Sequence, residues 1–400
     1  MLVFVGLIFV VIGLIHFYLW KRLARDPLRP GRARRVGAIL AVVLALLVPA
    51  TLIGTRTGHA EWLAWPGYLW LALMFYLLVT LAMLEIPRAA IRLWWRSSAK
   101  TKVLEPAGAG APARTETPAA EEPDEKAGIE RRLLLARGAA IFAGLTAAGI
   151  TGYGVRTALG PPQLDRWSMP MAKLPRTMDG LRLAVVSDIH LGPLTGTRHV
   201  GRIVDLINSV QADIVCVVGD LVDGTVAELG RFATPLADIE SRHGAYFVTG
   251  NHEYYSGYEP WIEEVTRLGL RPLRNERVEI DGLDLAGVND LGGAPFDDGP
   301  DFAKALGDRD ASRPVVLMAH QPAAARDAAP FGVDLQLSGH THGGQMAPFN
   351  LLVKLDQPVV SGYGNVDGVP VYVTNGAGFW GPPVRVGAPP QVTVVELRAM

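Results

Sequence analysis

Four long apolar runs occupy the first 160 residues, and a lipid bilayer leaves such runs few possible structures. They cover residues 2–20, 37–54, 62–84 and 138–155. Every backbone amide in hydrocarbon must be hydrogen-bonded within the protein, and a helix of about 20 residues crosses the core. The first three runs therefore predict transmembrane helices. The fourth is rich in Ala and Gly, as packed membrane helices often are, and we expect it to span too, with an interfacial or soluble helix as the alternative.

Basic residues between the runs predict an orientation. The segment 21–35 holds seven Lys and Arg residues, and further basic residues follow the third run and precede the fourth, whereas the link between the second and third runs has only Arg56. Basic loops stay in the cytoplasm. We therefore expect a multi-pass inner or plasma membrane protein with an exterior N-terminus. Four spans would return the chain to the periplasmic or exterior side, whereas three would leave the C-terminal region in the cytoplasm.

One histidine, His16, lies inside the first run. An intramembrane histidine can be functional, but this one stands near the end of the run beside Tyr18 and Trp20. We expect its side chain to reach the headgroup region.

Composition divides the chain into regions. Residues 105–130 are mostly Pro, Ala, Gly, Glu and Asp without apolar periodicity, which predicts a flexible acidic linker. We therefore expect a membrane region with three helices over 1–104, this linker, a fourth transmembrane helix over 131–160, and a folded domain over 161–400. About 240 residues are ample for one such domain.

The folded region alternates short apolar runs with helical periodicity, then continues with hairpin signals around Asp281-Gly282. This order predicts an α/β layered sandwich with mixed sheets. The expected strands cover 181–187, 213–218, 245–249, 315–319, 333–337, 370–374 and 391–397, and the expected helices cover 200–210 and 258–268.

Five short polar blocks each follow one of the strand-like runs. They are Asp188-Ile189-His190, Gly219-Asp220, Gly250-Asn251-His252-Glu253, His320 and Gly339-His340-Thr341-His342. Ligands of open α/β sheets bind beyond the carboxyl ends of strands. Residues two apart on an extended backbone point the same way, so Asp188 should act together with His190, and His340 with His342. A lone Asp or His is most often a turn or packing residue, but five such blocks predict a metal site.

The ordered blocks resemble the calcineurin-like metallophosphoesterases over Leu181 to Gly378, and the run Gly339 to Gln345 looks like that of a bacterial branch of membrane-associated phosphodiesterases. The resemblance implies a layered α/β/β/α sandwich with two divalent metal ions. It further implies that His252 is catalytic and protonates the leaving oxygen or stabilises charge. The implied metal ligands are Asp188, His190 and His342 for one ion, Asn251, His320 and His340 for the other, and Asp220 as a bridge between both.

The expected function is a membrane-anchored phosphoesterase that hydrolyses a phosphodiester or pyrophosphate bond by attack of a metal-bridging hydroxide. The mixed ligands suit Mn, Fe or Zn better than Ca or Mg. The alternatives are a phosphomonoesterase and a non-catalytic membrane sensor of metal or phosphate, against which the intact His252 argues. We expect a phosphorylated small molecule or a lipid-like compound as substrate. A net charge of −1 argues against a nucleic-acid partner.

Several residues outside the ligand set also carry expectations. Glu253 should support the loop of His252, and His199 and His243 should be ordinary surface residues. The pair Asn289-Asp290 ends a strand and should form a turn, with a place at the border of the pocket as the alternative. Four aromatic residues are left open between core packing, a substrate pocket and a membrane-facing surface: Tyr254, Tyr255, Phe379 and Trp380.

Overall fold

The computed structural model describes residues 2–101 and 125–400, which form two compact units. The first unit combines residues up to 52 with residues 70–151, and the second combines 53–69 with 152–400. Most of the predicted linker, 105–130, lies outside the described residues, and helix α4 begins within it at Glu125. The region boundaries expected from composition remain predictions.

Long apolar helices make up the N-terminal part of the chain. They are α1 (Leu2–Trp20), α2 (Arg32–Arg56), α3 (Ala64–Thr101) and α4 (Glu125–Leu159). By length and composition, four segments are apolar enough to cross a membrane: Gly6–Arg25, Arg32–Arg56, Glu61–Ala90 and Arg132–Leu159. The Ala-rich fourth run is thus part of a helix that is long and apolar enough to cross a membrane.

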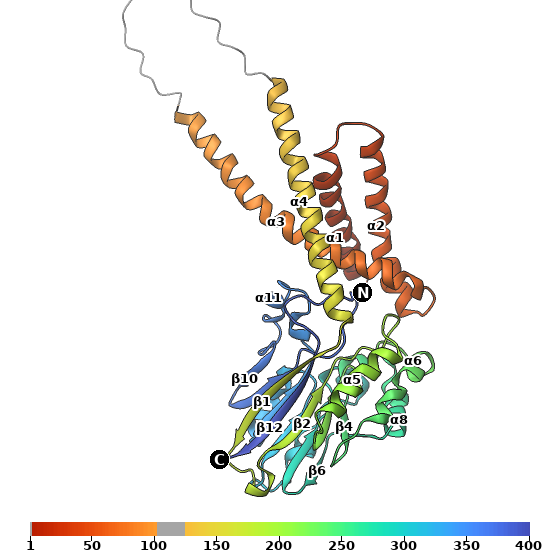
Figure 1. The fold of residues 1–400 in the computed structure, drawn as a ribbon, viewed down its shortest axis with the longest axis vertical. Coiled ribbons are helices and arrows are strands. Elements are labelled where there is room, and N and C mark those ends of the chain that lie inside the picture. The colour runs from red at the N-terminus through yellow and green to blue at the C-terminus, as the bar shows by residue number, and fades with distance from the viewer. Residues whose placement is uncertain (1, 102–124) are drawn as a thin grey trace, which may run out of the picture. The chain divides into compact units, whose positions relative to one another are not determined.

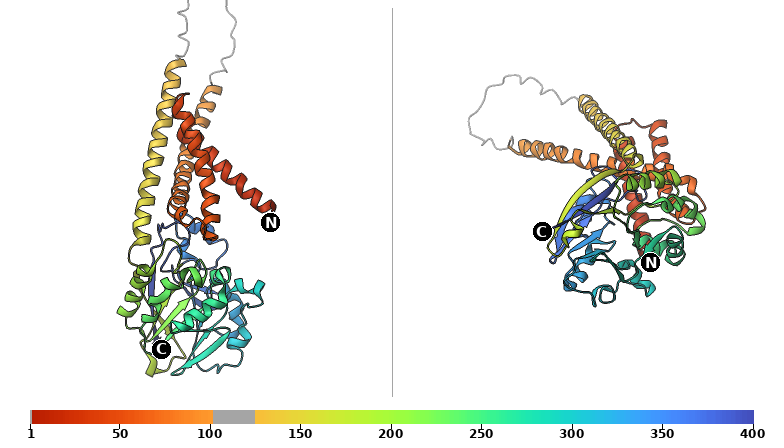
Figure 2. Two further views of the ribbon diagram at one scale, coloured as in Figure 1. Left: turned by 90° about the vertical axis from the view of Figure 1, so that its right-hand side faces the viewer. Right: turned by 60° about the horizontal axis from the view of Figure 1, so that its bottom comes forward.

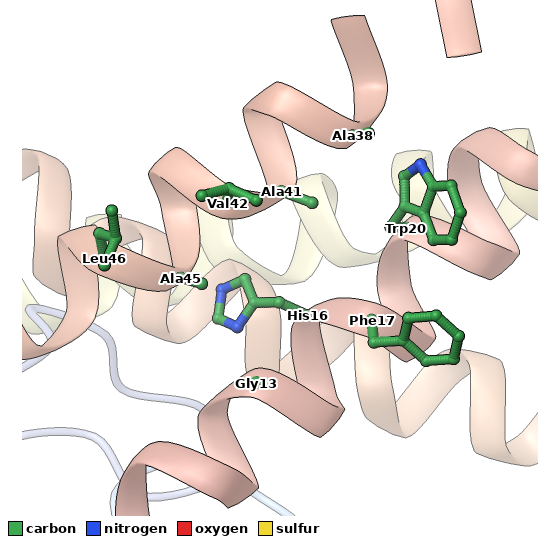
Figure 3. Close-up of a pocket in the computed structure, with 9 residues that line it drawn as sticks. All are labelled: Gly13, His16, Phe17, Trp20, Ala38, Ala41, Val42, Ala45 and Leu46. Atoms are coloured by element: carbon green, nitrogen blue, oxygen red, sulfur yellow. The ribbon is translucent and has the colours of Figure 1, made fainter. Parts of the chain in front are cut away.

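The expectation for His16 is wrong. Its side chain is only 3 % exposed, its Nδ1 lies 2.8 Å from the carbonyl oxygen of Ile12, and the indole nitrogen of Trp70 donates to its Nε2 at 3.1 Å. Figure 3 shows the ring facing an otherwise apolar groove of about 320 Å³ between α1 and α2. Packing against Trp70 keeps the ring inside the helix bundle of the first unit and prevents it from extending toward a headgroup.

Two six-stranded mixed sheets form the centre of the second unit (Figure 1). The first has the order β1-β12-β2-β3-β4-β5 and the second β10-β11-β9-β8-β7-β6. In the first sheet β2, β3, β4 and β5 are parallel, as are β7, β8, β9 and β11 in the second. The strands of the first sheet are β1 (Gln163–Met171), β2 (Leu181–Val186), β3 (Ile214–Val218), β4 (Ala245–Val248), β5 (Leu270–Pro272) and β12 (Gln391–Ala399). Those of the second are β6 (Glu276–Ile280), β7 (Leu283–Gly287), β8 (Val315–Met318), β9 (Leu335–Ser338), β10 (Gly362–Val366) and β11 (Val369–Val373).

Helices cover the outer face of each sheet, which gives the predicted α/β/β/α order of layers (Figures 1 and 2). One buried cluster joins β2, β3 and β4 to α5 and α8, a second fills the space between the sheets, and a third joins the second sheet to α9 and α10. The helices of this unit are α5 (Thr197–Ser209), α6 (Val226–Ala233), α7 (Asn251–Ser256), α8 (Tyr258–Arg267), α9 (Phe302–Leu306), α10 (Ala325–Ala328) and α11 (Asn350–Val353). The expected fold is confirmed.

Burial on both faces explains which strands were visible in the sequence. All five residues of β3 are buried, and such doubly covered parallel strands appear as continuous apolar runs. Strand β1 was missed because it is an edge strand whose first four residues are exposed, with Asp165 and Arg166 among them. It pairs in parallel with β12 from Gln163 to Met171.

Candidate metal centre

The five blocks meet at one edge of the sandwich, because each follows the carboxyl end of a parallel strand. Asp188 follows β2, Asp220 follows β3, and Asn251 follows β4 and begins α7. His320 follows β8 and His340 follows β9. Two sheets therefore contribute side chains to one site.

The backbone of these blocks is left-handed, so the expectation of extended D-x-H and H-x-H segments is wrong. The φ angles are 52° at Asp188, 48° at His190, 53° at Asp220, 69° at His340 and 52° at His342. A non-glycine residue in this region costs about 1–3 kcal/mol and persists only where the surrounding structure enforces it, often at functional sites. The side chains converge through these turns, not through the alternation of a strand.

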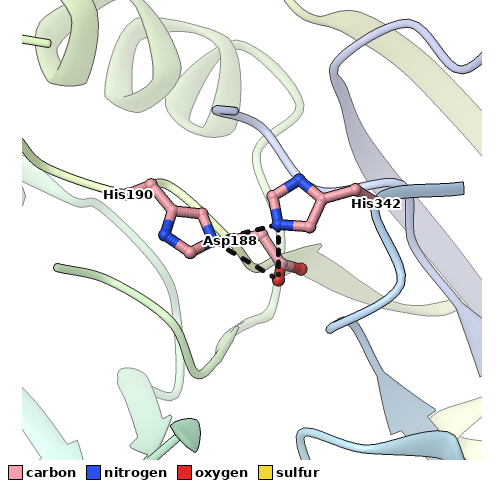
Figure 4. A group of neighbouring side chains, drawn as sticks. All are labelled: Asp188, His190 and His342. Atoms are coloured by element: carbon pink, nitrogen blue, oxygen red, sulfur yellow. Dashed lines mark hydrogen bonds and ion pairs between the residues drawn. The ribbon is translucent and has the colours of Figure 1, made fainter. Parts of the chain in front are cut away.

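The first group consists of Asp188, His190 and His342, all buried (Figure 4). The Nε2 atoms of the two imidazoles are 2.9 Å apart. Both approach Oδ1 of Asp188, from 3.9 Å for His190 and from 3.4 Å for His342. Two nitrogens and one oxygen thus surround a common point, an arrangement that suits a divalent transition metal.

The second group consists of Asp220, His320 and His340. Asn251 adjoins it in the chain, because the backbone N–H of the next residue, His252, donates to Oδ1 of Asp220 at 2.9 Å. His320 places its Nδ1 2.8 Å from the carbonyl oxygen of Val218, and its Nε2 lies 3.1 Å from Oδ2 of Asp220. The same carboxylate oxygen is 3.8 Å from Nε2 of His190. Asp220 therefore lies between the two groups.

Besides Nε2 of His320, which faces the carboxylate of Asp220, two further buried polar atoms of the second group have no hydrogen-bond partner among the residues that the structure describes. They are Oδ1 of Asn251 and Nδ1 of His340. An unsatisfied buried polar atom costs about 1–3 kcal/mol, so such atoms call for an explanation. A cation would satisfy both, because each atom offers a lone pair. The residues present therefore fit a metal ion at this position.

Burial and nearby charge set the ionisation of the site. Burial lowers the pKa of His340 to about 4, and burial with the charge of Arg385 lowers that of His342 well below its usual range. Neutral imidazole is the form that binds a metal. Burial would also lower the pKa of His320, but the carboxylate of Asp220 outweighs it and raises the pKa well above the usual value. The same pairing overcomes the effect of burial on Asp220 and holds its pKa well below the usual range.

Glu253 connects two of the strand ends. Its buried carboxylate accepts hydrogen bonds from the backbone N–H groups of Gly250 at 2.6 Å, Asp220 at 3.0 Å and Leu221 at 2.8 Å. Burial and the charge of Asp220 raise its pKa to about 7. A side chain at Gly250 would collide with Asp220, so only glycine fits this contact. As expected, Glu253 supports the loop that carries His252.

His252 is paired with a carboxylate that the sequence analysis missed. Its Nδ1 lies 2.6 Å from Oδ1 of Asp223, and the same oxygen is 2.9 Å from Nδ1 of His190. Burial lowers the pKa of His252, but the hydrogen bond to Asp223 and the charges of Asp220 and Glu253 outweigh it and raise the pKa to about 9. The sequence did contain one sign of this role, because Asp223 follows the predicted ligand Asp220 by only three residues.

Two aromatic rings form the exposed rim around His252. Tyr255 and Trp380 are 60 % and 58 % exposed, and their ring centroids lie 5.6 Å and 5.9 Å from that of His252. The other two aromatic residues left open, Tyr254 and Phe379, are buried and belong to the packing.

Arg385 was also missed and lies fully buried behind His342. It donates to the carbonyl oxygens of His342 at 2.8 Å and Gly378 at 2.9 Å, and its Nη2 is 3.0 Å from Nδ1 of His342. Burial lowers its pKa to about 9. No motif marks this arginine, because it reaches the site from a loop far along the chain.

Two further expectations can be compared with the structure. The expectation that His199 is a surface residue is wrong. Its side chain is buried on the inner face of α5, where burial lowers its pKa to about 4. The turn at Asn289-Asp290 is confirmed, since Asp290 accepts from the backbone N–H of Gly292 at 2.7 Å and begins a short 3-10 helix.

Comparison with known proteins agrees with this geometry. Residues 181–344 match the calcineurin-like phosphoesterase family. A transmembrane protein with metallophosphoesterase domain from Danio rerio is 37 % identical over 64 % of this chain and 62 % of its own length. An uncharacterized metallophosphoesterase from Helicobacter pylori is 38 % identical over 62 % of this chain and 68 % of its own length. One from Aquifex aeolicus is 32 % identical over 59 % of this chain and 92 % of its own length.

The chain thus spans less than two thirds of the Danio rerio relative. Apolar helices in the chain and relatives named as transmembrane proteins agree on association with a membrane. Together, the matched residues and these relatives place the chain in the calcineurin-like metallophosphoesterase family of metal-dependent phosphoric ester hydrolases.

Proposed function

We propose that this protein is a membrane-anchored hydrolase that uses two divalent cations to cleave a phosphodiester or pyrophosphate bond. The observation that carries the proposal is the convergence of nitrogen and oxygen donors from five strand ends, with Oδ1 of Asn251 and Nδ1 of His340 buried and unpartnered among the described residues. Preference for diesters over monoesters is proposed from membrane anchoring and from the resemblance to membrane-associated phosphodiesterases.

The two groups of side chains suggest the ligand assignment. Asp188, His190 and His342 would hold one cation, and Asn251, His320 and His340 would hold the other, with Asp220 between them. Two cations bound there would activate water and neutralise charge on the phosphate oxygens. The mixture of imidazole, carboxylate and amide donors favours Mn, Fe or Zn.

His252 is proposed to hold the proton that the leaving oxygen receives. Its Nδ1 is engaged by Asp223, and its Nε2 lies 4.0 Å from Oδ2 of Asp220, on the side of the metal groups. A pKa raised to about 9 keeps the ring protonated at neutral pH. Asp223 is a positioning residue: it fixes the orientation of His252 and stabilises its positive charge.

We also propose that four helices span the membrane and that the catalytic domain faces the periplasm or the exterior. The basic segment 21–35 supports this orientation by the positive-inside rule. A reporter fused after Met400 should indicate an exterior location, and a cytoplasmic signal would contradict four spans.

The test of function uses the full chain, purified in detergent, stripped of metal and reloaded with Mn, Zn or Fe. Hydrolysis of bis(p-nitrophenyl) phosphate is compared with that of p-nitrophenyl phosphate, and His252→Ala is measured in parallel. We expect metal-dependent turnover of the diester and a loss of about 100-fold or more in His252→Ala, the usual size of a general-acid contribution.

Other outcomes would change the proposal. Preference for the monoester would retain the site but make the protein a phosphatase. Binding of two metals without turnover of either ester would contradict hydrolysis of a simple diester and favour a selective pyrophosphatase or a sensor.

A further inference from the structure

An unusual concentration of exposed leucines marks one short segment of the domain. Residues 161–400 contain four leucines with large exposure, and three of them lie in or just after α11: Leu351 at 60 %, Leu352 at 57 % and Leu355 at 84 %. The fourth, Leu164, is 37 % exposed. Single exposed leucines are ordinary, but a cluster on a water-facing surface marks a site of interaction.

This segment is attached directly to the metal centre. The short 3-10 helix that contains His342 ends at Gly344, and Gly344 packs so closely on Asn350 that a side chain there would collide with α11. The backbone N–H of Ala347 donates to the carbonyl oxygen of Val386 at 2.9 Å. The exposed leucines therefore stand on a backbone held next to a proposed metal ligand.

The end of α4 packs on the same small region, and all of these residues belong to the second unit. The backbone N–H of Arg385 donates to the carbonyl oxygen of Gly154 at 3.0 Å, and Gly154 leaves no room for a side chain against Val384. The segment 384–386 thus touches the last turns of a helix of membrane-spanning length on one side and the approach to α11 on the other. Figure 1 shows α11 at the end of the domain where α4 ends, away from the C-terminus.

The segment between α2 and α3 also reaches the second unit, at the aromatic rim formed by Tyr255 and Trp380. The guanidinium of Arg56, at the end of α2, lies 5.9 Å from the ring of Tyr255, which itself contacts His252. Two segments that adjoin candidate spans therefore lie beside residues of the metal centre: 384–386 contacts His342, and Arg56 contacts Tyr255. Leu351, Leu352 and Leu355 follow Ala347, which is hydrogen-bonded to the first of these segments.

We propose that α11 and Leu355 insert into the membrane interface and that the substrate is an amphiphile whose apolar chain stays in the bilayer while its phosphate enters the metal centre. Leucine side chains suit the acyl boundary, and the exposed Lys354 suits anionic headgroups. Tyr255 and Trp380 form the aromatic rim through which the headgroup passes. The substrate half of the proposal rests on the proposed function, whereas the insertion of α11 does not.

Insertion is tested by labelling the full chain with an environment-sensitive fluorophore at Leu355→Cys. The native Cys216 is fully buried and burial raises the pKa of its thiol to about 12, so the label selects the new cysteine. The matched control is Met400→Cys, 66 % exposed at the opposite end of the domain. In vesicles of phosphatidylcholine and phosphatidylglycerol, spin-labelled lipids should quench the probe at position 355 but not at 400. Equal exposure of both probes to water would overturn the insertion.

The substrate class is tested with two chromogenic diesters that share one reacting group, hexadecyl p-nitrophenyl phosphate in vesicles and methyl p-nitrophenyl phosphate in solution. We expect the parent chain to prefer the hexadecyl ester. The combined substitution of Leu351, Leu352 and Leu355 by Ser should lower kcat/KM for that ester by about tenfold or more, which corresponds to about 1.4 kcal/mol, and leave the methyl ester unchanged. Met400→Ser is the control.

The outcomes separate the two proposals. Equal use of both esters by the parent chain, or an equal loss on both in the leucine variant, would overturn the amphiphilic substrate. Absence of turnover of either ester by the metal-loaded parent would contradict the proposed function, and the depth of the label at position 355 would still decide the insertion.

Discussion

The two halves of the metal centre differ in how completely the protein satisfies them. In the first half, the backbone N–H of His340 donates to Asp188 at 3.0 Å, Asp223 pairs with His190, and Arg385 lies against His342. In the second half, polar atoms of Asn251 and His340 remain buried without partners among the described residues. The first half is organised by the chain itself, and the second should depend more on a bound cation. Asp220 joins the two.

The largest expected effect comes from Asp220→Asn, because this change removes the charge shared by both halves. Loss of residues that merely support metal ligands costs about 10–100-fold, so the shared carboxylate should cost more than 100-fold in hydrolysis of bis(p-nitrophenyl) phosphate. The measurement combines initial rates with bound-metal content. Asp281→Asn, an exposed carboxylate on the β6–β7 turn, is the control. Full activity in Asp220→Asn would mean that the halves work independently.

The second-largest effect should be a difference in thermal stability between metal-free variants of the two halves of the metal centre. Asn251→Leu removes a buried unpartnered oxygen, so the metal-free chain should unfold at an unchanged or higher temperature, and the stabilisation by added Mn should shrink. His190→Leu removes the hydrogen bond between Nδ1 of His190 and Asp223 and should lower the unfolding temperature, since a hydrogen bond to a charged group is worth about 1.5–3 kcal/mol. Thermal unfolding of both variants with and without metal makes the comparison. A lower unfolding temperature of metal-free Asn251→Leu would contradict the proposed difference.

The pH profile should show how Asp223 acts through His252. The protonated form of His252 exists below its pKa of about 9 and is lost as the pH rises through that value, which gives an alkaline limit of activity. The carboxylate of Asp223 raises this pKa, so the neutral amide in Asp223→Asn should lower it. The alkaline limb of kcat should therefore move to lower pH, with a loss of about 10–100-fold near the optimum.

Two controls define that shift. His252→Ala should show no alkaline limb from this group at all. Asp298→Asn replaces another partly buried carboxylate, which Arg274 contacts away from His252, and should keep the parent profile. An unmoved limb in Asp223→Asn would leave Asp223 as a structural residue only.

Residues that must be metal-binding types could be recognised in the sequence, whereas residues that only the folded chain brings to the site could not. Asp188, His320 and His340 were visible because donors of this kind recur after apolar strands, where ligands bind. Their left-handed backbone was not visible, since Asp and His adopt positive φ angles in only a small fraction of positions. Arg385 was missed because only the folded chain brings it behind His342.

Edge strand β1 shows the same limit for the fold. Its pairing with β12 joins residues that are far apart in sequence, and its exposed face leaves no apolar pattern. Secondary structure buried on both faces could be predicted, whereas structure held by one long-range partner could not.

The smallest expected effect concerns His16, a buried histidine that has none of the features of the metal centre. Its ring nitrogens contact Ile12 and Trp70, and it belongs to none of the groups of three or more metal-binding side chains found among the described residues. His16→Phe should remove both hydrogen bonds, each worth about 0.5–1.5 kcal/mol, and change hydrolysis of a soluble diester less than twofold. Trp70→Phe breaks only the hydrogen bond between the indole and Nε2 of His16, so it should lower thermal stability by a smaller amount. A large loss of activity in His16→Phe alone would show that a buried histidine of the apolar helices matters to the reaction. The comparison between the two halves of the metal centre would then have to include these helices.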